Sequence, residues 1–215
     1  HWLGISMLIK KIFEDYKTKK FNTYDIGFII APIFNAAGRL EDAKRAVELF
    51  IEKDHRVCSE IINELLNNNT ERKEIQEMIL ERALFKIENE KLFEDSVLVV
   101  AEEGFHHGVI GIVASKILDR YYKPTIIMEI KPEEGIATAS CRSIEGFNMI
   151  EALNTMKELF VKYGGHAGAA GFSIKIENIN EFSKRINEYA KENIPESSLI
   201  KPVKLDITIP AYKIS

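Results

Sequence analysis

Residues 96–130 read SVLVVAEEGFHHGVIGIVASKILDRYYKPTIIMEI, and this stretch decides the fold. Its first part, 96–101, is rich in β-branched residues and predicts a buried strand. Residues 109–121 place apolar side chains at helical spacing, and 124–130 predicts a second strand. Two strands separated by a helix of this length indicate an α/β domain.

The pattern continues downstream of this unit. Strands are expected at 136–141 and 171–176, which makes a mixed sheet the predicted architecture. Helices are expected at 148–161 and 179–193, and the glycine-rich stretch 164–168 between them is expected to be a loop.

Upstream of the sheet the sequence predicts helices. An amphipathic helix is expected at 3–16 and another at 41–51, after the segment 35–40 has broken an apolar run. Residues 54–89 contain no Pro or Gly and predict one long helix with a polar middle. Such a helix often bridges two domains through solvent, and a helix–turn–helix broken near Asn69 is the alternative.

The composition limits the possible classes of protein. The chain has 215 residues and a formal net charge of −4, which argues against a general basic coat for nucleic acid. No apolar run reaches the roughly 18–20 residues of a membrane span, so we expect no membrane association. Cys58 and Cys141 lie far apart, which fits two free thiols in a reducing, cytoplasmic compartment. Because the chain begins with His1 and has no signal-peptide pattern, we expect a piece of a longer protein.

Glycine clusters mark where chemistry is expected, because nine of the twelve glycines lie beyond residue 100. In the first cluster, Gly104–Gly111, backbone N–H groups at a helix start favour an anion, and His106 or His107 would add a donor. Alternatively, these glycines only permit close packing of strand and helix.

Two further segments combine polar side chains with a strand or a loop. Ser140 and Arg142 lie two residues apart, so both face the same side of a strand and suit a phosphate, unless Arg142 is an ordinary surface residue. The run Gly164–Gly171 is almost all Gly and Ala, so the backbone, Gly165 included, can approach a phosphate while His166 projects. The alternative is a tight turn capped by His166.

The fourth candidate is the pair Asn35 and Arg39, placed to present both side chains at a domain edge. A helix N-terminus with Arg39 in a salt bridge is the alternative. The aspartates form no Asp-x-Asp motif, and the chain has no P-loop and no CxxC. The sequence therefore predicts a part that grips substrate without its reaction centre.

These motifs resemble those of RecJ single-strand-specific exonucleases, which belong to the DHH phosphoesterases. The matching segments are Asn35–Leu40 (NAAGRL), Gly104–Gly111, Ser140–Phe147 and Gly164–Gly171 (GGHAGAAG). They occur in the family's order over roughly residues 23 to 176. Phe105 stands where the family usually has Trp, and Gly168 where many members have a larger residue; Phe105 would still offer an aromatic face.

The resemblance implies a division of the chain. Residues 1–52 would end the DHH catalytic domain, and 53–91 would be the connecting helix. Residues 92–195 would be the DHH-associated domain that binds substrate, and 196–215 a linker and the first strand of an oligonucleotide-binding domain.

The resemblance also implies an activity. The family degrades single-stranded DNA from the 5′ end with Mn²⁺ or Mg²⁺, in recombination and repair. Its metal ligands would lie upstream of this chain, so the fragment alone is expected to be inactive. Substrate contacts carry over to Arg39, Ser140, Arg142, His166 and Gly165, with Asn35 and His106 as further candidates.

Partners and alternatives follow from the same resemblance. An SSB-type protein and a RecQ-type helicase are expected as partners beside single-stranded DNA. The alternatives are a smaller DHH phosphoesterase acting on short oligonucleotides, cyclic dinucleotides or nucleotide 3′-phosphates, and a non-catalytic binding module like that of alanyl-tRNA synthetases.

Overall fold

The structure is a computed structural model that describes residues 2–40, 42–202 and 207. The chain divides into two compact units. We call residues 1–85 with 104–113 the helical unit, and residues 86–103 with 114–215 the sheet unit.

The sheet unit contains a five-stranded sheet in the order β1-β2-β3-β5-β4. β1 (Leu98–Glu103) and β2 (Thr125–Lys131) are parallel, and the connection between them contains α5 (His107–Tyr121). The strands β3 (Ile136–Arg142), β5 (Ala169–Lys175) and β4 (Phe160–His166) add antiparallel pairs. The predicted mixed α/β sheet is therefore confirmed.

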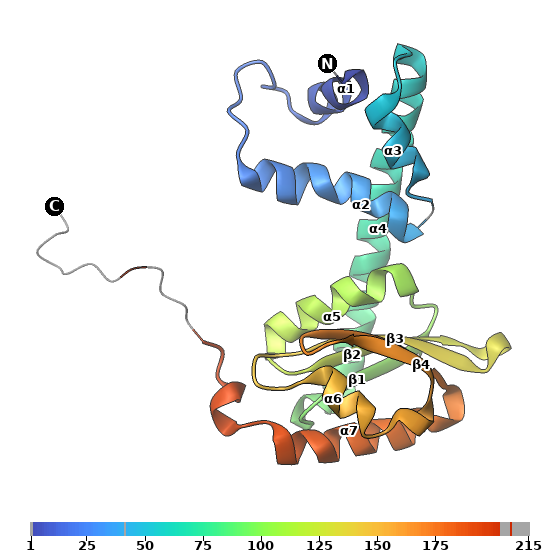
Figure 1. Ribbon diagram of the computed structural model, residues 1–215, viewed down its shortest axis with the longest axis vertical. Coiled ribbons are helices and arrows are strands. Elements are labelled where there is room, and N and C mark those ends of the chain that lie inside the picture. The colour runs from blue at the N-terminus through green and yellow to red at the C-terminus, as the bar shows by residue number, and fades with distance from the viewer. Residues whose placement is uncertain (1, 41, 203–206, 208–215) are drawn as a thin grey trace, which may run out of the picture. The chain divides into compact units, whose positions relative to one another are not determined.

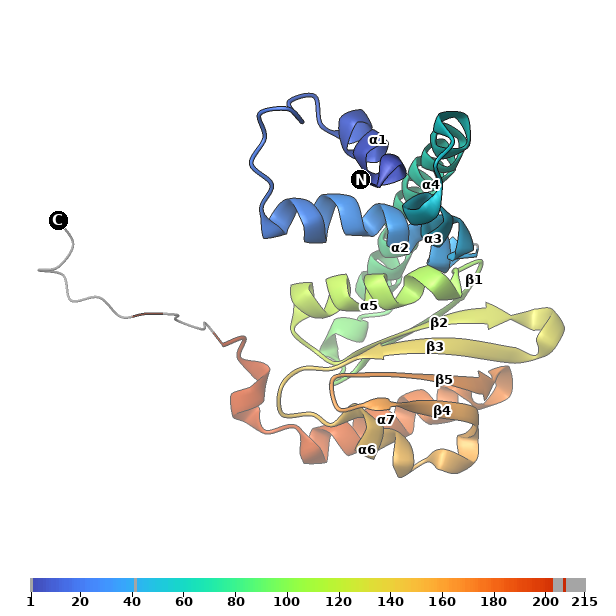
Figure 2. The ribbon, with the colours of Figure 1, turned by 45° about the horizontal axis from the view of Figure 1, so that its top comes forward.

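Helices lie on both faces of this sheet. Figures 1 and 2 show α5 over one face, and α6 (Met149–Asn154) and α7 (Ile179–Asn193) over the other. The apolar side chains of β3, such as Ala137 and Cys141, join α6 and α7 in the core. Thr138, Ser140 and Arg142 alternate with them and are only half-buried, so they face the opposite side of the sheet.

The glycine-rich stretch is not the loop that the sequence predicts. The predicted helix 148–161 is also wrong beyond Asn154, because the chain makes a 3-10 turn at Lys157–Leu159 and then enters β4. Phe160 begins this strand and packs its ring 4.7 Å from that of Phe172 on β5. An aromatic residue packed in this way holds β4 in the sheet although glycines follow it.

The helical unit contains α1 (Leu3–Ile12), a π-helical segment (Asp25–Ile30), α2 (Ala31–Leu40), α3 (Lys44–Ile51) and the first part of α4 (His55–Asn89). α1 ends four residues before the predicted position, and 35–40 lies inside α2 rather than breaking the chain before a helix. Leu8, Leu49, Ile61 and Leu65 are fully buried in the core of this unit.

α4 is one continuous helix of 35 residues, so the alternative of a break near Asn69 is wrong. Its polar middle differs from the prediction in another respect. Asn68, Asn69 and Gln76 are buried, so this part of the helix is not a solvated spacer.

Several remaining predictions concern the cysteines and the end of the chain. Cys58 and Cys141 are both free, as predicted, and both are buried. Within 196–215, expected to hold a linker and a first strand, Glu196–Leu199 forms a 3-10 turn. The strand expected there, residues 203–209, lies outside the described residues, apart from residue 207. Within the described part of the chain, no helix combines the length and apolar character that crossing a bilayer requires.

Candidate nucleic-acid interface

Two cross-strand rows in the sheet unit bring predicted residues together. Arg142 pairs with Ala169, and Ala169 pairs with His166 on β4. In the neighbouring row, Ser140 pairs with Gly171, which pairs with Gly164. Directly opposed residues share a face of the sheet, so Arg142, Ser140 and His166 surround a floor of Gly and Ala.

This floor, defined by Gly164, Ala169 and Gly171, is open to a ligand. Gly164 is exposed, and a Cβ built there would have no neighbour within 4 Å. The absence of side chains lets a strand of nucleic acid lie against the backbone, which larger residues would prevent.

Arg142 is held in place before any ligand binds. Its Nε donates to Ser115 Oγ at 3.1 Å, and its Nη1 donates to Ser140 Oγ at 3.1 Å and to the Cys141 carbonyl at 2.8 Å. The predicted shared face of Ser140 and Arg142 is confirmed. Because its hydroxyl accepts a bond from the guanidinium, Ser140 is a positioning residue for Arg142 as well as a candidate ligand.

His166 and Gly165 lie where β4 turns into β5. The Gly168 N–H donates to His166 Nδ1 at 3.3 Å, so the imidazole caps the turn and remains exposed. Gly165 has a φ of +147°, and a Cβ there would lie 2.5 Å from Ala170 Cα. Only glycine fits position 165 without strain. His166 caps the turn and is also exposed, so the two predicted alternatives hold together.

In the helical unit, Asn35 and Arg39 lie one turn apart on α2 and are both exposed. They line a cavity of about 420 Å³ together with Phe34, Gly38 and Ala43. Arg39 lies in the last turn of the helix, and its Nη1 donates to the Gly108 carbonyl at 2.9 Å. The alternative of a helix N-terminus is therefore wrong for Arg39.

His106 accepts hydrogen bonds from the backbone N–H groups at the start of α5, so these groups are not available to an anion. Its carbonyl accepts from the N–H groups of Val109 and Ile110, and its Nδ1 accepts from the Gly108 N–H at 3.2 Å. Its ring stacks on that of His107. The expectation of free N–H groups at residues 108–110 is wrong for this structural reason.

The structure also corrects the expected role of Phe105. Its side chain is buried, and the guanidinium of Arg82 lies 5.3 Å from its ring centroid. Phe105 therefore packs inside the helical unit and offers no exposed aromatic face.

The site residues thus form two groups, each within one unit. Ser140, Arg142, Gly165 and His166 belong to the sheet unit, and Asn35, Arg39 and His106 to the helical unit. Sequence reasoning did not assign Ser115 to the first group. Its sequence signal is a hydroxyl directly after the apolar run 109–114.

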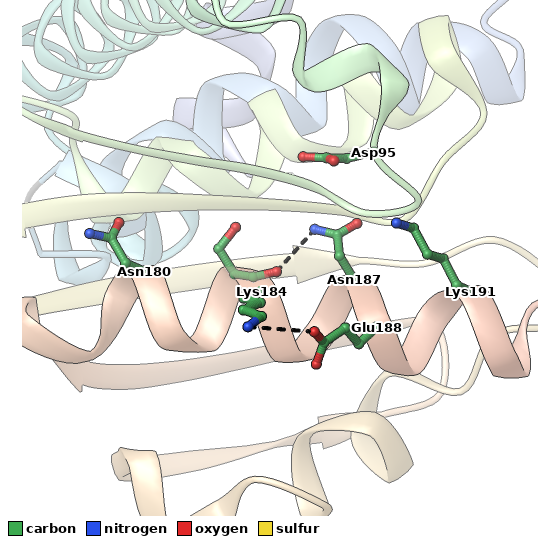
Figure 3. Close-up of a pocket in the computed structure, with 7 residues that line it drawn as sticks. Asp95, Asn180, Lys184, Asn187, Glu188 and Lys191 are labelled. Carbon is green, nitrogen blue, oxygen red and sulfur yellow. Dashed lines mark hydrogen bonds and ion pairs between the residues drawn. The ribbon is translucent and has the colours of Figure 1, made fainter.

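Another hollow in the sheet unit has a structural explanation. It measures about 380 Å³ and is lined by α7 residues together with Asp95 (Figure 3). At its wall, Asn187 Oδ1 accepts from the Val97 N–H at 2.8 Å, and Asn187 Nδ2 donates to the Val97 carbonyl at 3.2 Å. The Asn187 amide thus satisfies both backbone groups of Val97, as a neighbouring strand would. The residues that line this hollow include none of the predicted site residues.

The described residues do not meet the needs of a divalent metal. Metal-dependent hydrolysis requires several carboxylates or imidazoles that converge on the ion. Nowhere in residues 2–40, 42–202 and 207 do three or more His, Cys, Asp or Glu side chains gather for this purpose. The residues present here do not fit a metal centre, and we derive no metal-dependent step from them.

Comparison with known proteins identifies the class of the sheet unit. Residues 94–192 match the family model described as the DHHA1 domain. This part of the chain is therefore a DHHA1 domain.

The chain is also related to the RecJ single-stranded-DNA-specific exonucleases, which confirms the resemblance seen in its motifs. It is 37% identical to the Bacillus subtilis protein over 95% of this chain, and 33% identical to the Escherichia coli protein over 91%. It spans 26% and 35% of these two relatives.

A solved structure agrees with this relationship. RecJ from Thermus thermophilus in complex with Mn²⁺ matches with a TM-score of 0.76 and 29% identity. The match covers 89% of this chain and 27% of that one.

Proposed function

We propose that this chain is the substrate-binding part of a RecJ-type 5′→3′ exonuclease that degrades single-stranded DNA in recombination and repair. The relationship to RecJ exonucleases supports the activity, and the limited share of those relatives supports a catalytic part outside this chain. The division into DHH end (1–52), connecting helix (53–91), DHHA1 domain (92–195) and start of a further domain (196–215) belongs to the same proposal.

One observation carries the role of the sheet unit. Arg142 and His166 flank a floor without side chains, and Arg142 is fixed by protein hydrogen bonds. A guanidinium that is fixed at a bare stretch of sheet suits a phosphodiester, because its planar fork matches two phosphate oxygens. Gly165 shapes the turn that places His166.

Asn35 and Arg39 would contact the strand from the helical unit. Both are exposed at the same cavity, and the described residues include no carboxylate that pairs with Arg39. His106 acts indirectly, since its Nδ1 accepts from the N–H of Gly108, the residue whose carbonyl accepts from Arg39.

In the intact enzyme, Mn²⁺ or Mg²⁺ would be held by residues outside this chain and would supply the activated water. The residues of this chain would bind the strand and neutralise its phosphates. A cytoplasmic location and association with an SSB-type protein or a RecQ-type helicase are further parts of the proposal.

The test is Arg142→Ala in the intact protein, with degradation and binding of a long single strand as readouts. Loss of a charged hydrogen-bonding partner is expected to weaken binding by about 1.5–3 kcal/mol, or roughly 10- to 150-fold. Arg56→Ala removes the same charge from an arginine that pairs with Glu60 and whose side chain is 85% exposed. Equal affinity of both variants would contradict the role of Arg142.

A substrate panel tests the alternatives. Long single strands are expected to be degraded, and 5-mers and cyclic dinucleotides are not expected to be preferred. Preference for the short substrates would favour the smaller DHH phosphoesterases, and binding without any hydrolysis by the intact protein would favour a non-catalytic module.

A further inference from the structure

Arg72 on α4 is a half-buried cation that has no role in the proposed function. Its Nη1 donates to Gln76 Oε1 at 2.9 Å, and its Nη2 donates to Asn69 Oδ1 at 2.7 Å. Both amides belong to buried side chains on the same face of the helix, so they fix the guanidinium in one orientation.

The protein does not neutralise this charge in its described part. Neither amide carries charge, and no described carboxylate lies within ion-pair distance of Arg72. The two bonds leave the remaining N–H donors of the fork available. Partial removal of a cation from water without a nearby anion raises the free energy of the ligand-free protein. A bound anion would offset this cost.

Arg39 is a second cation of the helical unit. Burial, and after it the positive charge of Arg39, lowers the pKa of Arg72 from its ordinary value. Arg39 itself donates to a carbonyl, which leaves its full charge in place.

We propose that Arg72 is a further phosphate-binding residue, which holds a phosphate group of the single strand against the helical unit. This inference rests on the proposed function, because it names one more contact to the same substrate. A phosphate fits better than a neutral ligand, since two of its acceptor oxygens can meet the guanidinium fork and its charge offsets that of Arg72.

Arg72→Gln in the intact protein tests the inference by equilibrium binding to a single strand at several salt concentrations. Affinity is expected to fall about tenfold or more. The slope of log K against log salt is expected to shrink by about 0.7, the value for one phosphate contact on a single strand. A purely structural role for Arg72 would leave this slope unchanged.

Three variants separate charge from folding. Arg72→Lys keeps the charge and is expected to retain the salt slope with intermediate affinity. Gln76→Ala keeps the guanidinium but removes half of its clamp, so a smaller loss of affinity with an unchanged slope is expected. Arg56→Gln, on the same helix and outside the site, controls for net charge.

Strands with and without a 5′-terminal phosphate identify the source of the bound group. A loss confined to the phosphorylated strand assigns Arg72 to the terminal phosphate, and an equal loss assigns it to an internal phosphodiester. If Arg72→Gln matches Arg56→Gln in affinity and slope while Arg142→Ala weakens binding, this inference is wrong and the proposed function stands. If Arg142→Ala also has no effect, the proposed function fails.

Discussion

At the scale of single residues, the main finding is how few side chains the sheet-unit site uses. Arg142 alone brings a permanent positive charge to the two cross-strand rows. Ser115 and Ser140 accept bonds from it and fix its direction. The formal net charge of −4 is therefore compatible with nucleic-acid binding, because a few fixed cations act locally where the floor is bare.

Gly164 offers a direct test of the floor. A Cβ at this position meets nothing in the free protein, and its φ lies outside the left-handed region. Gly164→Ala and Gly164→Val are therefore expected to fold normally, with stability unchanged or raised by up to about 1 kcal/mol.

The same side chains would occupy the space that the strand of DNA needs. Affinity for single-stranded DNA is expected to fall progressively from Gly to Ala to Val, severalfold at least for Val, as measured by fluorescence anisotropy. Thermal melting of each variant serves as the folding control. Undiminished affinity of a well-folded Gly164→Val protein would place the DNA elsewhere.

Some of these residues could be predicted from the sequence and others could not. Ser140 and Arg142 were predictable, because alternation along a strand is a local property. The bond from Arg142 to Ser115 spans 27 residues and depends on how α5 lies on the sheet. The sequence did not single out Arg72. Its site depends on the burial of Asn69 and Gln76, which tertiary packing determines.

At the scale of elements, β4 shows where local patterns fail. Because glycine has low strand propensity, the stretch 164–168 favours a loop in the sequence. The apolar residues 159–161 extend the predicted helix that precedes it. Pairing with β5 from Phe160 to His166, with an irregularity between Phe160 and Lys162, overrides both tendencies. The helix at 107–121 and the strand at 136–142 were predicted closely because period and propensity agree there.

The hydrogen bonds between Asn187 on α7 and Val97, the residue before β1, are expected to stabilise the fold. Asn187→Ala would leave the buried N–H and C=O of Val97 without their side-chain partner. A loss of about 1–3 kcal/mol in the free energy of unfolding is expected, measured by urea denaturation.

Lys184 provides the matched control on the same helix. Its side chain is 77% exposed and pairs with Glu188, at 3.9 Å (Figure 3). Lys184→Ala is expected to change stability by no more than about 0.5 kcal/mol. Similar losses for the two variants would mean that Asn187 is not a structural link.

At the scale of the whole molecule, binding and hydrolysis are expected to be separable. Purified residues 1–215 should bind single-stranded DNA with an affinity that falls as salt rises, by about 0.7 log units per log unit of salt for each phosphate contact. Addition of Mn²⁺ should not produce hydrolysis of an end-labelled strand, because the residues proposed to hold the metal lie outside the chain.

The matched control for this experiment is the intact protein under the same conditions. Hydrolysis by residues 1–215 that copurifies with the chain and is reduced by Arg142→Ala would contradict the proposed separation. Hydrolysis that Arg142→Ala leaves unchanged would instead indicate a contaminating nuclease.

The clamp on Arg142 has a kinetic consequence. Because three protein hydrogen bonds already select its rotamer, the conformational entropy of this long side chain is lost during folding rather than during binding. Encounter with a strand then requires no reorganisation of the guanidinium, so the association rate should depend mainly on diffusion and charge. Substitutions around the clamp should therefore act mostly on the lifetime of the complex.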